Sequence, residues 1–104
     1  MSIRIHEERC IGCGRCTEAC PGNLLRLSSN GKAEIRAVED CWGCTACMKE
    51  CPVSAIGYFL GADIGGSGGT LRIEREGHSY HWRIEQPGRA DTVITIDRQN
   101  ANRY

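Results

Sequence analysis

The alternation of apolar and polar residues predicts short strands at both ends of the first sixty residues. Residues 2–6 read Ser-Ile-Arg-Ile-His, which suits a strand with Ile3 and Ile5 facing inward and His6 on the solvent side. Residues 55–60 form another apolar run that could pair with the first. Together these segments predict a small antiparallel sheet.

Two further apolar runs, 24–27 and 33–38, predict a hairpin. A two-residue turn at its tip would set Leu27 opposite the charged Glu34 on the same face. A three-residue loop with a left-handed glycine buries Leu27 against Ala33 instead, so burial favours this second register. The favoured register has these pairs and this loop: Leu25 with Ile35, Leu27 with Ala33, and Ser29-Asn30-Gly31.

The last third of the chain predicts a three-stranded antiparallel meander over residues 70–76, 78–86 and 92–97, with Gly77 and Pro87-Gly88 at the turns. Each strand has apolar residues on one face: Leu71, Ile73, Tyr80, Trp82, Ile84, Ile94 and Ile96. A lone sheet of three strands is marginally stable, so one face is expected to rest on the first half of the chain or on a second protein.

A glycine-rich stretch, residues 61–69, separates the two parts. It lacks the G-x-G-x-x-G spacing of a nucleotide-binding loop, and a predicted strand follows it rather than a helix. We therefore expect a flexible connector or a close-packed crossing of the backbone.

The composition of the chain excludes several classes of function. The 104 residues carry 13 basic and 13 acidic side chains, seven of each up to Leu60 and six of each after it. No basic stripe for nucleic acid, membrane-spanning run or signal peptide is visible. We expect a cytoplasmic protein that binds neither nucleic acid nor membrane. A chain this short buries little apolar surface, so a metal centre is expected to supply much of its stability.

Eight cysteines identify that centre. They form two runs of the pattern C-x2-C-x2-C-x3-C-P, 31 residues apart, which is the ligand spacing of proteins with two [4Fe–4S] clusters. Three cysteines on a tight loop direct their thiolates to one cube, and the fourth of each run ligates the other cluster. The cluster I set is therefore Cys10, Cys13, Cys16 and Cys51, and the cluster II set is Cys41, Cys44, Cys47 and Cys20.

Other interpretations of the cysteines and histidines are weaker. Disulfides need an oxidising compartment, and structural zinc usually takes separated C-x2-C pairs. His6, His78 and His81 are expected to be ordinary strand residues, because the cysteine complement is already full and two histidines do not complete a metal site.

Residues 1–60 resemble the bacterial two-cluster ferredoxins. Over nearly its whole length the chain looks like the iron–sulfur beta subunits of adenylylsulfate reductases. Four features carry this closer resemblance: Cys20-Pro21-Gly22-Asn23-Leu24, Cys41-Trp42-Gly43-Cys44, Gly68-Gly69-Thr70, and Trp82 in the middle predicted strand.

The resemblance implies a partner. Such beta subunits bind a flavin-containing alpha subunit of the fumarate reductase type and pass electrons through both clusters to the flavin. It implies that cluster I faces the flavin, with Trp42 as the bridging aromatic; alternatively, Trp42 only shields a cluster from water. The family's insertion in the first cysteine run and its long C-terminal tail are missing here, so the partner's substrate stays open.

We therefore expect an α+β fold: a ferredoxin-like two-cluster domain (1–60), a glycine-rich connector (61–69), and a three-stranded antiparallel sheet with a short tail (70–104). The expected function is one-electron relay to a flavoprotein, with no catalytic residue on this chain. A freely diffusing ferredoxin is the alternative, and a zinc-stapled interaction module is a third hypothesis. The balanced charge favours a dedicated subunit, since a shuttle commonly relies on a strongly charged face.

Overall fold

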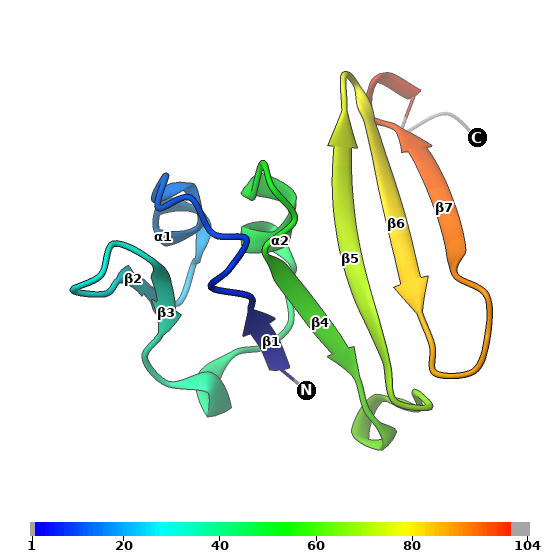
Figure 1. Cartoon of the computed structure of the whole chain (residues 1–104), viewed down its shortest axis with the longest axis horizontal. Helices are drawn as coiled ribbons and strands as arrows, with labels where there is room; N and C mark the ends of the chain where they lie inside the picture. The colour runs from blue at the N-terminus through cyan, green and yellow to red at the C-terminus, as the bar shows by residue number, and fades with distance from the viewer. Residues whose placement is uncertain (1, 101–104) are drawn as a thin grey trace.

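The computed structural model describes residues 2–100 of the 104, so the predicted tail at 101–104 lies outside the described residues. Over these described residues the chain forms seven strands, two five-residue α-helices and three 3-10 turns (Figure 1). In chain order they are β1 (Ser2–Ile5), α1 (Arg15–Ala19), β2 (Leu25–Leu27), β3 (Ala33–Ile35), η1 (Val38–Asp40), α2 (Ala46–Glu50), β4 (Ile56–Leu60), η2 (Ala62–Ile64), β5 (Gly69–Glu76), β6 (Ser79–Glu85), β7 (Thr92–Asp97) and η3 (Arg98–Asn100).

The strands make one five-stranded antiparallel sheet, in the order β1-β4-β5-β6-β7, and the separate β2-β3 hairpin (Figure 1). The predicted pairing of the first strand with residues 55–60 is present, with Ile3 opposite Tyr58. The C-terminal strands were expected to form a sheet of their own. Instead β5 pairs directly with β4, and Tyr58 lies opposite Leu71. The three-stranded meander therefore extends the sheet of the first half.

The glycine-rich stretch produces this continuity. The Gly68 amide donates to the Leu60 carbonyl at 2.8 Å, and the Gly66 amide donates to the Gly61 carbonyl at 2.9 Å. A Cβ atom on Gly66 would lie 2.3 Å from the Leu60 oxygen, a distance that no side chain tolerates. Of the two expectations for this stretch, the structure shows the close-packed crossing.

The hairpin has the predicted register. Leu25 lies opposite Ile35 and Leu27 opposite Ala33. Gly31 has a φ of 78°, the left-handed conformation that the three-residue loop requires.

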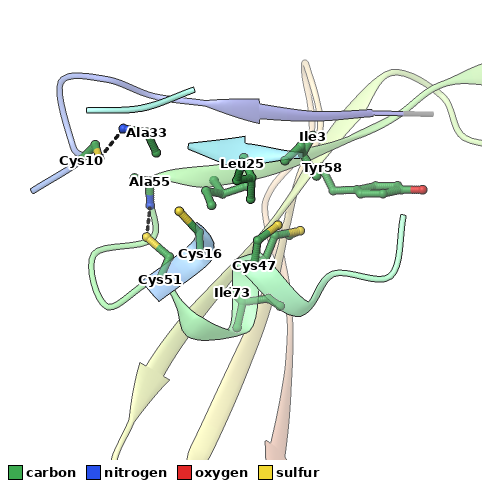
Figure 2. Packing of buried hydrophobic residues seen from close by; sticks show 12 residues of the cluster. Ile3, Cys10, Cys16, Leu25, Ala33, Cys47, Cys51, Ala55, Tyr58 and Ile73 are labelled. Atoms are coloured by element: carbon green, nitrogen blue, oxygen red, sulfur yellow. Dashed lines mark hydrogen bonds between the residues drawn. The ribbon is translucent and has the colours of Figure 1, made fainter. Parts of the chain in front are cut away.

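One core holds both halves together. Met48 of α2 and Ile73 of β5 are each 1% exposed and belong to the same buried cluster as Ile3 and Tyr58 (Figure 2). Trp82 packs against this cluster, with the Lys49 ammonium 5.6 Å from the centre of its ring. The C-terminal sheet thus rests on the first half of the chain.

The opposite face of β5 and β6 is polar. Arg72 pairs with Glu85 at 2.9 Å, and Arg83 pairs with Glu74 at 2.5 Å. Strand β7 forms the outer edge of the sheet and is exposed along its whole length.

Over residues 2–100, no helix is long and apolar enough to cross a bilayer.

Candidate metal centres

The 31-residue sequence repeat is also a repeat of backbone conformation. The first three cysteines of each run lie on the loop and first turn that lead into α1 or α2. The residue before each helix is left-handed, with φ of 77° at Gly14 and 66° at Thr45. Asn23 and Ser54, which follow the two fourth cysteines at the same offset, both have φ of 53°. The two loops therefore present their thiols in the same way.

The thiols gather into the two predicted sets. The cluster I set lines one cavity, beside Ile11 and Leu27. The cluster II set lines a second cavity, beside Trp42 and Asp40. Helices α1 and α2 lie side by side (Figure 1), so the fourth cysteine after each helix reaches the cavity of the other run.

The donor chemistry fits a four-iron cluster in each cavity. Among residues 2–100, no three Cys, His, Asp or Glu side chains meet closely enough to hold a single metal ion, whereas four thiols surround each cavity. Four thiolate ligands around a central space are what a [4Fe–4S] cluster requires.

Backbone amides already point at the sulfurs. The Ala55 amide donates to Cys51 Sγ at 3.2 Å, and the Ala33 amide donates to Cys10 Sγ at 3.4 Å (Figure 2). The Leu24 amide donates to Cys20 Sγ at 3.4 Å. Such N–H···S bonds stabilise thiolates and raise the reduction potential of a cluster.

Burial holds two of the thiols in their protonated form when no metal is bound. The pKa of the Cys47 thiol is raised to about 12, first by burial and then by the neighbouring Cys44, Cys16 and Cys41. Burial also raises the pKa of Cys16, followed by the effect of Cys13, Cys51 and Cys10. Iron has to displace these protons, so cluster binding releases protons and depends on pH.

Trp42 is 66% exposed and lines the cavity of the cluster II set. The family resemblance implied that Trp42 bridges cluster I to a flavin. Trp42 lines the cavity of the cluster II set and does not line that of the cluster I set, and its role as a bridging aromatic stays a prediction. Ile11, the equivalent position in the first run, is 63% exposed beside the cluster I set. Each cavity therefore has an exposed apolar residue at its border.

The histidines have ordinary partners. His81 contacts Thr95 at 2.9 Å and Glu76 at 3.1 Å, and His6 lies 3.4 Å from Arg72. His78 precedes β6 and its carbonyl accepts from the Arg98 amide at 2.8 Å.

Sequence analysis missed the amide donors and one side chain. The Leu24 and Ala55 amides each lie four residues after a fourth cysteine, so the repeat itself could have indicated both. The Lys32 ammonium donates a hydrogen bond to the Cys10 carbonyl, and no sequence pattern indicated that contact.

Known proteins match these features. Residues 3–57 match the family model of the 4Fe-4S dicluster domain, which includes both cysteine runs. A chain from an adenosine 5'-phosphosulfate reductase solved in complex with substrate superposes with a TM-score of 0.74 and 26% identity. That superposition covers 90% of this chain and 67% of the other chain.

Three relatives match about half of the chain or less. An uncharacterized ferredoxin of Methanocaldococcus jannaschii is 43% identical over 58 residues, which are 54% of this chain and 75% of that protein. A ferredoxin of Pyrobaculum islandicum is 42% identical over 54 residues, 52% of this chain and 50% of that protein. The NADH-quinone oxidoreductase subunit I of Carboxydothermus hydrogenoformans is 36% identical over 42 residues, 36% of this chain and only 30% of that protein.

Proposed function

The chain belongs to the 4Fe-4S dicluster family of electron-transfer iron–sulfur proteins, and we propose that it is the dedicated electron-transfer subunit of a flavoenzyme. In this proposal it relays single electrons to a flavin-containing partner of the adenylylsulfate reductase and fumarate reductase type. The two-electron chemistry occurs on the partner's flavin.

The proposal assigns the ligands as two crossed sets. Cys10, Cys13, Cys16 and Cys51 hold one [4Fe–4S] cluster, and Cys41, Cys44, Cys47 and Cys20 hold the other. Each bound cluster supplies reversible one-electron chemistry. The polypeptide holds the thiolates in place, keeps water from the buried sulfurs and sets the reduction potentials through the amides that point at sulfur.

The C-terminal sheet is the observation that most supports the proposal of a dedicated subunit. The two ferredoxin relatives match only about half of the chain, whereas the likeness to the reductase chain covers 90% of it and so includes strands beyond residue 60. A protein that only shuttles electrons does not need this extension. The sheet is continuous with β4 and shares its core, which supports its role as a fixed part of an assembly surface.

We further propose that the partner's flavin approaches on the Trp42 side, next to the cluster II set. An exposed indole at the border of that cavity can pack against a partner while shortening the path from the cluster. A cytoplasmic location, where thiols stay reduced, completes the proposal.

The second candidate is a freely diffusing ferredoxin that serves several enzymes. Two relatives that are named as ferredoxins favour it. Its weakness is the equal number of acidic and basic residues, 13 of each, which leaves the polypeptide without the strong charge that steers a shuttle to its partners.

Native mass spectrometry of the tagged protein, purified without oxygen from its own host, tests the proposal. A stable complex with a flavin-bearing chain is the expected result, and the partner's sequence would then indicate the substrate. If only the 104-residue chain appears, with mass for eight irons and eight sulfides, the free ferredoxin is correct. A colourless, zinc-containing protein would contradict both the flavoenzyme subunit and the free ferredoxin.

A further inference from the structure

The tip of the β2–β3 hairpin lies directly on the loop of the first cysteine run. A Cβ on Gly12 would lie 2.4 Å from the Gly31 oxygen, so the two backbones are in contact. Two consecutive residues next to this tip bond the same cysteine: the Lys32 ammonium donates to the Cys10 carbonyl, and the Ala33 amide donates to Cys10 Sγ. The hairpin thus brings a positive charge against a ligand of the cluster I set.

The charge of Lys32 is not neutralised by its neighbours. The nearest carboxylate along the strand, Glu34, is already paired with Arg26 at 2.6 Å. Within residues 2–100 the ion pairs do not include Lys32. The side chain is partly buried, so water screens its charge less than that of an exposed lysine.

The cluster II set has different surroundings. The wall of its cavity includes a carboxylate, Asp40, where the first cavity has a lysine bonded to one of its ligands. The two cysteine loops have the same backbone conformation, but the charged residues beside them differ.

We propose that Lys32 is a tuning residue that raises the reduction potential of the cluster held by Cys10, Cys13, Cys16 and Cys51. Uptake of one electron adds one negative charge to that centre, and a nearby ammonium stabilises the more negative form. The inference rests on the proposed ligand sets, and it does not depend on the flavoprotein partner.

Reductive titration of the holoprotein, followed by proton NMR of the hyperfine-shifted cysteine β-CH2 signals, tests this proposal cluster by cluster. In Lys32→Gln and Lys32→Met, the midpoint of the Cys10 set should fall by about 59 mV, the one-electron equivalent of a tenfold change in the equilibrium constant. The midpoint of the Cys41 set should not change. Lys32→Arg keeps the charge and should keep the midpoint near that of the unchanged protein.

Arg89→Gln is the matched control, because it removes one positive charge from an exposed side chain in the β6–β7 loop. It should move neither midpoint. Unchanged midpoints in both neutral Lys32 variants, or equal shifts in Arg89→Gln, would overturn the proposal. Loss of the cluster in both neutral variants, seen by iron and sulfide counts, would make Lys32 a structural residue and overturn it as well. The midpoints and the iron and sulfide counts test only the role of Lys32. The subunit proposal is tested separately, by native mass spectrometry of the complex, so the two proposals can fail independently.

Discussion

At the scale of single residues, the close contact between Gly12 and Gly31 determines how the first cysteine loop is built. Gly12 has a φ of 71°, and a Cβ atom on it would lie only 2.4 Å from the Gly31 carbonyl oxygen. Sequence analysis predicted the cysteine ligands from their spacing alone, because ligand spacing is local. It could not find this contact or the Lys32 bond to Cys10, because both join segments that only the folded hairpin brings together.

Gly12→Ala should therefore destabilise the holoprotein far more than Gly65→Ala. Gly65 also has a positive φ, 80°, but open space surrounds its Cβ position, so alanine there incurs only the left-handed backbone penalty of about 1–2 kcal/mol. At Gly12 the clash with backbone adds to that penalty. Thermal loss of the cluster absorbance in the two variants measures the difference, and equal losses would mean that the close contact is unimportant.

At the scale of elements, periodicity predicted the strands well. The last strand was predicted at 92–97 and is observed as Thr92–Asp97, and the hairpin register was predicted correctly. Periodicity indicates which face of a strand is buried but not which strand lies beside it. For this reason the β4–β5 pairing across the glycine-rich stretch was missed, and the division of the chain at 61–69 stays a prediction.

Ile73→Ala tests whether the C-terminal sheet shares the core of the cluster domain. Ile73 is 1% exposed and lies opposite Trp82, so its truncation should cost about 2–5 kcal/mol of unfolding free energy. Val93 on the edge strand is 44% exposed, and Val93→Ala should cost less than about 1 kcal/mol. Chemical denaturation followed by both circular dichroism and cluster absorbance measures the two variants. If Ile73→Ala is as mild as Val93→Ala, or if it changes only the sheet signal, the shared core is wrong.

At the scale of the whole molecule, the family match confirms the prediction of two [4Fe–4S] clusters, and the fold explains why they are needed. Among the residues whose burial the structure describes, twelve form the buried core, and four of these are cysteines: Cys10, Cys16, Cys47 and Cys51. The inorganic centres thus occupy the place where a larger protein would have a purely apolar core.

Removal of the clusters should accordingly unfold at least the first half of the chain. Anaerobic chelation of iron, followed by circular dichroism, is expected to abolish the signal of the native fold as the cluster absorbance disappears. Restoring iron and sulfide under reducing conditions should recover both. A chelated protein that keeps its native spectrum would show that the polypeptide does not depend on the metal.

The central claim is that each fourth cysteine ligates the cluster of the other run, which binds the two halves of the repeat into one relay. Proton NMR of the cysteine β-CH2 signals in Cys20→Ser tests it most directly, because serine can replace the thiolate as a ligand while changing the electronic structure of its own cluster. The account predicts shifted signals for Cys41, Cys44 and Cys47, with those of Cys10, Cys13 and Cys16 left in place. Shifts confined to Cys10, Cys13 and Cys16 would contradict it.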